Sequence, residues 1–290
     1  MAQNAIVFGG SGFLGSHVSD VLSEIGYEVT IFDLETSSYL QPGQKMVVGD
    51  ILDREKVIKA VNGKDVVYHF AGLADLDDAK TKPMETVTRN ILGTVNVLDA
   101  AVKAKVKHFI FSSTIYVYSS RGGFYRCSKQ AGELYIEEYQ KRYGLDFTIL
   151  RYGSLYGPRA TENNGIMRLL RQGLESGKIT YQGTGEEMRE YIYIKDAAKL
   201  TVDILSEKKK NRHLIITGHH PMKGSDMMKT INEILGNKVH VEYKNTPSSD
   251  HYGLTPYSFK PNFGSKLVSN VYMDMGQGLL ECLHEIFGEQ

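Results

Sequence analysis

The sequence has 290 residues, of which 34 are basic and 34 are acidic, so its formal net charge is zero. This balance provides no whole-chain charge that would attract nucleic acid or an anionic membrane, and we predict neither as a partner. Two cysteines are too few for a disulfide framework or a structural zinc site, and we predict no metal. Since no apolar stretch is long enough to span a bilayer and no signal peptide opens the chain, we expect a cytoplasmic protein.

The chain begins with an apolar run at residues 5–8, a glycine-rich turn, and an amphipathic stretch from Phe13 to Ile25. Strand, glycine turn and helix in this order predict a dinucleotide site. Gly9 would allow the sharp turn, Gly12 a close approach of backbone N–H groups to a pyrophosphate, and Gly15 tight packing of helix on sheet. The first helical residues, Phe13 and Leu14, would present the positive end of the helix. Glycines alone would equally fit a flexible loop, so the prediction depends on the rest of the chain.

Acidic residues follow the next two predicted strands, at residues 28–32 and 45–50. Asp33 lies near the spacing expected for the acid that binds the adenosine ribose, and its charge would repel the extra phosphate of NADP, so we predict NAD. Read alone, Asp33 would be a helix cap or a loop acid. Asp50 and Ile51 would lie beside the adenine, whereas Asp53 is better placed to cap the following helix.

Strands predicted at residues 65–70 and 107–113, with one long helix predicted from Pro83 to Lys105, continue the alternation. This pattern gives a parallel sheet with helices on both faces and a ligand crevice at the carboxyl ends of its strands. His69 is expected to be a packed core histidine. The remaining residues predicted at this edge are Phe70, Ala71, Gly72, Asn90 and Ser112.

Thr114 follows the fifth strand, and Tyr125 and Lys129 begin a helix that we expect to end at Gly144. Residues four apart share one helical face. A phenol with an ordinary pKa near ~10 is a poor base at neutral pH, but a neighbouring ammonium lowers that pKa. The pair would then serve as a general base. This spacing occurs by chance on many helices, and it gains weight here from its place in a nucleotide-binding sheet.

In this order, the motifs resemble those of the extended short-chain dehydrogenase/reductases, in the group of nucleotide-sugar epimerases and dehydratases. The resemblance is carried by Gly9-x-x-Gly12-x-x-Gly15, Asp33, Gly49-Asp50, His69-Phe70-Ala71-Gly72, Asn90-x-x-Gly93-Thr94-x-Asn96, Ser112-Ser113-Thr114, Tyr125-x-x-x-Lys129 and Arg151-Tyr152-Gly153-Ser154-Leu155-Tyr156-Gly157-Pro158. It implies an α/β fold with a Rossmann-type doubly wound parallel sheet and a smaller mixed α/β substrate-binding lobe. The expected domains are residues 1–158 for NAD and 159–290 mainly for the nucleotide sugar, with 190–217 returning to the main sheet.

The resemblance also implies roles for individual residues. Tyr125 would take the proton from a sugar hydroxyl, usually at C4, while hydride passes to NAD, and Lys129 would hold the nicotinamide ribose and lower the tyrosine pKa. Thr114 would bind the same sugar oxygen, and Tyr152 would lie near the nicotinamide. The resemblance also implies a homodimer that forms through the helices predicted at residues 83–105 and 125–143.

Substrate contacts are predicted at three further positions. Arg189 matches the family arginine that grips the substrate pyrophosphate, with a surface salt bridge to Glu187 or Glu190 as its alternative. Arg159 is a weaker second candidate. Ser154 stands where many relatives carry an asparagine that contacts the nucleotide sugar.

The reaction is narrowed by the two residues directly after Thr114. Relatives that eliminate water carry acids at these positions, which are Ile115 and Tyr116 here. The sequence therefore predicts oxidation at C4 of a UDP- or GDP-linked hexose or heptose, as a 4-epimerase or a net 4-dehydrogenase, in the synthesis of surface polysaccharide sugars. The competing hypothesis is a regulator that senses NAD without catalysis. Such proteins often lack the tyrosine–lysine pair that this chain has.

Overall fold

The computed structural model describes residues 3–205 and 209–244, and the predicted lobe residues 245–290 lie outside this part of the chain. Within it, the largest sheet has seven strands in the order β10-β6-β5-β4-β1-β2-β3, and all neighbours run parallel. Its strands are β1 (Asn4–Phe8), β2 (Glu28–Asp33), β3 (Lys45–Val48), β4 (Val66–His69), β5 (His108–Thr114), β6 (Phe147–Tyr152) and β10 (Arg212–Ile216). The predicted doubly wound α/β fold is confirmed.

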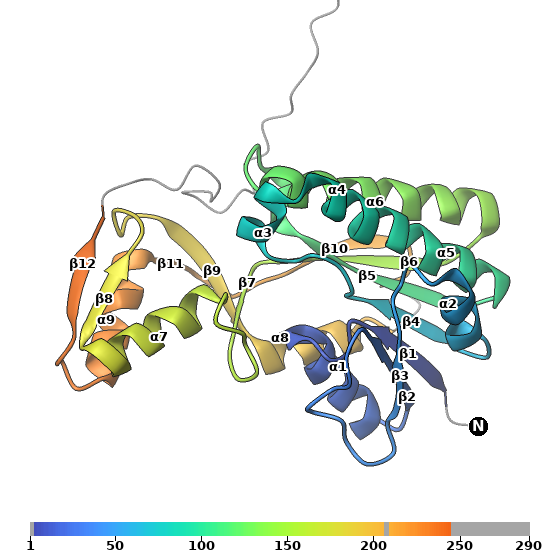
Figure 1. Ribbon diagram of the computed structural model, residues 1–290, viewed down its shortest axis with the longest axis horizontal. Coiled ribbons are helices and arrows are strands. Elements are labelled where there is room, and N and C mark those ends of the chain that lie inside the picture. The colour runs from blue at the N-terminus through green and yellow to red at the C-terminus, as the bar shows by residue number, and fades with distance from the viewer. Residues whose placement is uncertain (1–2, 206–208, 245–290) are drawn as a thin grey trace, which may run out of the picture. The chain divides into compact units, whose positions relative to one another are not determined.

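Helices cover both faces of this sheet, as Figure 1 shows. Alternate residues of β1 belong to the hydrophobic cores on opposite faces of the sheet. Ile6 and Phe8 pack on one face, and Ala5 and Val7 pack on the other. One face is covered by α2 (Arg54–Val61), α5 (Gly93–Lys103) and α6 (Gly123–Tyr143), and the opposite face by α1 (Phe13–Glu24) and α8 (Ile194–Asp203). A sheet buried on both faces explains why its strands are continuous apolar runs in the sequence.

The long helix predicted from Pro83 to Lys105 consists of three consecutive segments. These are α4 (Pro83–Thr86), the π-helical turn η1 (Val87–Leu92) and α5, and a short helix that was not predicted, α3 (Leu76–Thr81), precedes them. A π-helical turn changes the direction in which side chains project and is often found at functional sites. Asp53 caps α2 as expected, because its carboxylate accepts a hydrogen bond from the Lys56 backbone N–H at 3.1 Å.

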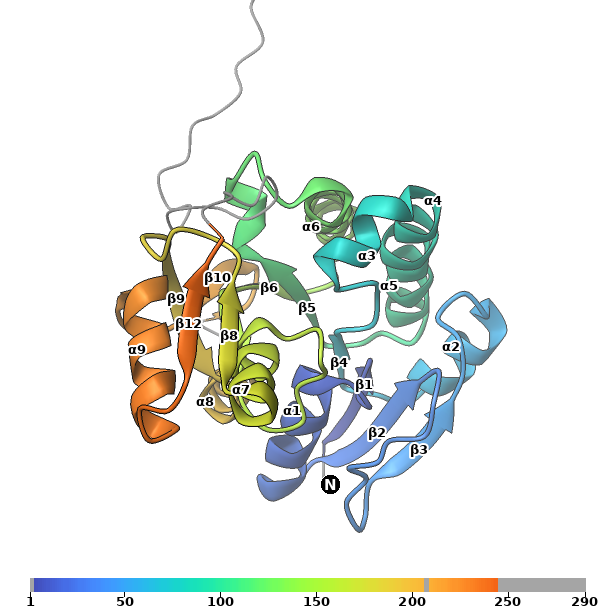
Figure 2. The ribbon, with the colours of Figure 1, turned by 60° about the vertical axis from the view of Figure 1, so that its left-hand side comes forward.

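Two smaller sheets and two helices form a lobe, shown from a second direction in Figure 2. Leu169, Ile179 and Met228 belong to the separate core that joins these helices and strands. The lobe elements are β7 (Ser154–Tyr156), α7 (Gly165–Ser176), β8 (Lys178–Tyr181), β9 (Met188–Tyr193), β11 (Pro221–Lys223), α9 (Gly224–Ile234) and β12 (His240–Tyr243).

The segment at residues 190–217 is divided between the two regions. Its first residues belong to β9, which pairs with β7 and β11 in the lobe. The chain then forms α8, which packs against α1, and β10, which pairs with β6 at the edge of the main sheet. Across the described ranges, no helix combines the length and apolar character needed to cross a membrane.

Candidate active site

The glycine turn between β1 and α1 has little room for side chains. Gly9 has a φ of +78°, and a Cβ atom there would lie 2.6 Å from the backbone nitrogen of Ala71. At Gly15 a Cβ atom would lie 2.1 Å from the carbonyl oxygen of Gly9. A side chain at either position would collide with backbone. The turn and the start of the helix therefore require glycine for the fold itself, whether or not a ligand binds there.

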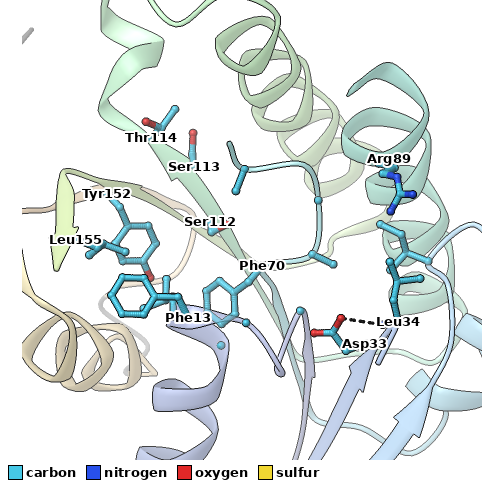
Figure 3. A pocket seen from close by; sticks show the side chains of 18 of the residues that line it. Phe13, Asp33, Leu34, Phe70, Arg89, Ser112, Ser113, Thr114, Tyr152 and Leu155 are labelled. Carbon is cyan, nitrogen blue, oxygen red and sulfur yellow. Dashed lines mark hydrogen bonds between the residues drawn. The ribbon is translucent and has the colours of Figure 1, made fainter. Parts of the chain in front are cut away.

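Gly12 differs, because the packing of the protein restricts it less than Gly9 and Gly15. Its φ is −77°, and the nearest atom to a Cβ placed there is the Gly9 carbonyl oxygen at 3.3 Å. The space above it belongs to a cavity of about 490 Å³, part of which Figure 3 shows. A cradle of bare backbone at a helix N-terminus fits the diphosphate of a dinucleotide.

The carboxylate of Asp33 is fixed at the same cavity. One oxygen accepts a hydrogen bond from the Ser11 N–H at 2.9 Å and the other accepts one from the Leu34 N–H at 2.8 Å. Each carboxylate oxygen can accept a second hydrogen bond, which suits the two ribose hydroxyls. Asp50 lines the cavity nearby, and its Oδ1 atom accepts from the Leu52 N–H at 2.9 Å. These residues therefore fit NAD.

Most of the residues predicted for the cofactor line this one cavity. They are Gly9, Gly12, Phe13, Leu14, Gly15, Asp33, Asp50, Ile51, Phe70, Ala71, Gly72, Ser112, Tyr125 and Tyr152. The ring of Tyr152 faces the cavity, but its hydroxyl lies 2.6 Å from that of Thr201 in α8.

Asn90, predicted to contact the cofactor, is buried beside the cavity and is not among the residues that line it. Its carbonyl oxygen accepts from the Leu73 N–H at 2.6 Å, and its amide donates to the Leu73 carbonyl and the Ser128 hydroxyl, each at 2.9 Å. The buried amide thus joins η1 to the loop after β4 and to α6. Asn90 thus holds the cavity wall at Gly72 and Leu73.

Tyr125 and Thr114 come together at the mouth of the cofactor cavity. Burial raises the pKa of Tyr125 to about 12, although a hydrogen bond with Thr114 acts in the opposite direction. Lys129 lies behind Tyr125, with its Nζ atom 5.8 Å from the centre of the phenol ring and 2.8 Å from the Ser112 carbonyl oxygen. Burial lowers the pKa of Lys129 to about 8. The sequence-based expectation of a lowered tyrosine pKa is not met in the protein alone, because desolvation of the phenol outweighs the hydrogen bond with Thr114.

A second cavity of about 690 Å³ lies between the end of the main sheet and the lobe. Arg189 of β9 and Ser154 of β7, two of the residues predicted to contact the substrate, line it. Glu187, one alternative partner of Arg189, is engaged by its own loop, where it accepts from the Thr184 and Gly185 N–H groups at 2.8 and 2.9 Å. The two cavities share Ala74, Thr114, Tyr125, Gly153, Leu155 and Asn164.

Arg159, the weaker candidate for a substrate contact, is not among the residues that line either cavity. Its guanidinium forms an ion pair with Asp20 of α1 at 2.8 Å and stacks 4.5 Å from the ring centre of Tyr39. These partners hold the loop after Pro158 against the nucleotide-binding half. Because Asp20 and Tyr39 are far from Arg159 in the sequence, local spacing gave no sign of this arrangement.

Three residues that sequence reasoning missed also line the cavities. Arg89 of η1 lines the cofactor cavity, Arg168 of α7 lines the second, and Asn164 lines both. Asn164 carried a detectable signal, since asparagine before a helical stretch favours an N-cap. Its Oδ1 atom accepts from the Ile166 and Met167 N–H groups, each at 3.2 Å.

A buried ion pair supports the site from behind. Arg151 of β6 donates to the two carboxylate oxygens of Glu133 in α6 at 3.0 and 2.6 Å. Ser113 of β5 donates to the same carboxylate, and Tyr118 accepts from Arg151. Arg151 also lies 2.8 Å from the Nδ1 atom of His213. Glu133 therefore connects the helix that carries Tyr125 and Lys129 with β6 through Arg151 and with β5, the strand that carries Thr114, through Ser113.

A family model described as the NAD-dependent epimerase/dehydratase family matches residues 5–217 of this chain. The chain belongs to this family. It is an enzyme of the extended short-chain dehydrogenase/reductase type, and its cofactor is NAD.

Relatives in this family act on several nucleotide sugars. The chain is 30% identical over 262 residues to a UDP-N-acetyl-alpha-D-glucosaminuronate decarboxylase of Bacillus cytotoxicus. The aligned region covers 81% of this chain and 78% of the relative. It is also 30% identical over 225 residues to a putative UDP-glucose 4-epimerase of Methanocaldococcus jannaschii. That aligned region covers 70% of this chain and 73% of the relative.

Solved structures show the same fold with ligands bound. UDP-glucose 4-epimerase of Thermotoga maritima, solved with UDP-glucose, has a TM-score of 0.79 and 28% identity, covering 86% of this chain and 87% of its own. UDP-glucuronic acid 4-epimerase of Bacillus cereus, solved with UDP-glucuronic acid and NAD, has a TM-score of 0.80 and 25% identity, covering 90% and 95%.

Proposed function

We propose that this protein oxidises C4 of a UDP-linked sugar with NAD and returns the hydride to the opposite face, as a 4-epimerase in surface polysaccharide synthesis. The observation that carries this proposal is that Thr114 and Tyr125 belong to both cavities. A sugar held in the second cavity would thus have its hydroxyl at the phenol and beside the cofactor. The names of the relatives support a uridine nucleotide.

The proton chemistry falls to residues of this chain. Bound NAD would supply the hydride acceptor and a positive charge beside the phenol. Tyr125 would take the C4 hydroxyl proton, while Thr114 holds the same oxygen by a hydrogen bond. Lys129 would contribute its ammonium, which lies behind the ring, to stabilise the phenolate. Because burial raises the pKa of Tyr125 in the protein alone, cofactor binding would assist formation of the base.

The nucleotide diphosphate would be held in the lobe. Arg168 and Arg189 line the second cavity from α7 and β9. Guanidinium groups match phosphate oxygens in a bidentate way, so two of them suit a diphosphate. Ser154 of β7 lines the same cavity and would contact the sugar.

The reaction is tested by incubating the NAD-loaded protein with UDP-glucose, UDP-N-acetylglucosamine and UDP-glucuronic acid. We expect NMR to show one sugar inverted at C4, with no net accumulation of NADH. A ketone formed together with an equal amount of NADH would instead identify a net 4-dehydrogenase. If no UDP-, GDP-, CDP- or dTDP-sugar is converted, the proposal is wrong.

We also propose a homodimer formed through the helices on the outer face of the nucleotide-binding half. Apolar side chains are exposed there, among them Met84 and Val87 before α5 and Leu134 in α6, whose exposed fraction is 65%. We expect Leu134→Glu to sediment as a monomer, because a charge at a buried interface is costly. Leu174→Glu in α7, where the leucine is 70% exposed, is the control and should leave the dimer intact. A monomeric unsubstituted protein would contradict this proposal.

A further inference from the structure

Arg89 lies at one end of the cofactor cavity, together with Asp33, Leu34, Asp50 and Ile51. Figure 3 shows it on the side of Asp33 and Leu34, away from Phe13 and Tyr152. The π-helical turn η1 carries Arg89 beside Asn90, so that one side chain faces the cavity and the next is buried against α6. Nothing in the sequence motifs of the family marks this position.

The charge at this end of the cavity is unusual. Among the residues that line it, all within the described ranges, Arg89 alone carries a positive charge, and Asp33 and Asp50 carry the negative ones. Arg89 pairs with neither of them. Its Nε atom forms an ion pair with Glu85, one helical turn earlier, at 2.9 Å. This contact uses one edge of the guanidinium and leaves its Nη donors and its flat face for a ligand.

Leu34 adds an apolar surface to the same end. Its exposed fraction is 48%, and it lines the cavity together with Ile51. Two apolar side chains and a planar cation at the same end of the cavity would suit a flat aromatic ring. Arginine stacks on aromatic faces through cation–π attraction, and it does so better than lysine because its group is planar.

We propose that Arg89 covers the adenine ring of NAD and is a binding residue for the adenine half of the cofactor. Asp50 would accept a hydrogen bond from the adenine amino group at the same end of the cavity. A pyrophosphate contact is less suited to Arg89, because Figure 3 places Phe13, which follows the glycine turn, away from it. A 2′-phosphate is disfavoured by the fixed carboxylate of Asp33. The proposal requires NAD as cofactor but not any particular sugar.

The test is equilibrium binding, by calorimetry, to the full-length protein freed of bound nucleotide. The ligands are NAD, ADP-ribose, which keeps the adenine half, and nicotinamide mononucleotide, which lacks it. We expect Arg89→Ala to lower the affinity for NAD and for ADP-ribose by the same factor, about tenfold. The affinity for nicotinamide mononucleotide should not change. Arg89→Lys should give a smaller loss, since it keeps the charge without the planar face.

Arg54→Ala is the matched control. Arg54 in α2 also forms an exposed ion pair, with Asp99 at 2.8 Å, but it does not line the cavity. We expect this variant to bind all three ligands like the unsubstituted protein. Unchanged NAD affinity in Arg89→Ala would overturn the proposal. So would a loss of affinity for nicotinamide mononucleotide as large as the loss for NAD. Since binding is measured without a sugar, failure here is separate from failure of the proposed reaction.

Discussion

Replacing Tyr125 by phenylalanine is expected to lower kcat by about 10²- to 10⁴-fold, while the Kd for NAD stays within about twofold. The phenyl ring keeps the contacts that Tyr125 makes at the junction of the two cavities, and only the hydroxyl beside Thr114 is lost. Without that oxygen, no group at this position takes the sugar proton. Single-turnover formation of NADH and calorimetric binding of NAD measure the two effects separately.

Tyr152→Phe is the control for that substitution. Tyr152 also lines the cofactor cavity, but its hydroxyl is directed to Thr201. We expect turnover to stay within a few-fold, with a loss of about 1 kcal/mol in the free energy of unfolding from the missing hydrogen bond. A Tyr125→Phe variant that retains turnover would remove the phenol from the mechanism. Intact NAD binding together with no turnover of any sugar by the unsubstituted protein would favour the regulatory hypothesis.

Arg151→Met is expected to lower the free energy of unfolding by about 3 to 5 kcal/mol. The side chains of Arg151 and Glu133 are only 14% and 8% exposed, so removing the guanidinium leaves a carboxylate buried and without its counterion. Ser113 continues to donate to it, but one hydroxyl does not offset the lost charge. Urea denaturation with the slope and midpoint fitted separately measures the change.

Two further variants make this prediction specific. Arg142→Met removes an arginine from an exposed pair with Glu138 on the same helix, and we expect a change below about 1 kcal/mol. The double variant Arg151→Met, Glu133→Gln should recover part of the loss, because no charge is left buried. If Arg151→Met costs no more than Arg142→Met, the buried pair does not stabilise the fold.

The nucleotide-binding half was predictable because its signals are local. Alternation of apolar runs with amphipathic stretches specified the strands and helices, and the residues at the strand ends converged because parallel strands end at one edge. Asp53 as a helix cap and Gly144 as a helix end followed from spacing alone. Such features need only a few neighbouring residues to be determined.

The missed features depend on partners that are distant in the sequence. Asn90 forms hydrogen bonds with Leu73 and Ser128, and Arg159 forms an ion pair with Asp20. No motif spacing reveals these contacts. The π-helical turn that carries Arg89 lies within a stretch that the sequence predicted as one regular helix. The tyrosine pKa was misjudged for a similar reason, since the extent of burial at Tyr125 is set by the whole fold.

The path of the chain has a consequence for the protein as a whole. It leaves the main sheet after β6, returns to it with α8 and β10, and then enters the lobe again. A fragment that stops at Pro158 would lose the helix that shields Val18 and Leu22, together with the edge strand beside β6. Neither half is one uninterrupted stretch of polypeptide, so an exchange of lobes between relatives would need three junctions, after β6, after β9 and after β10.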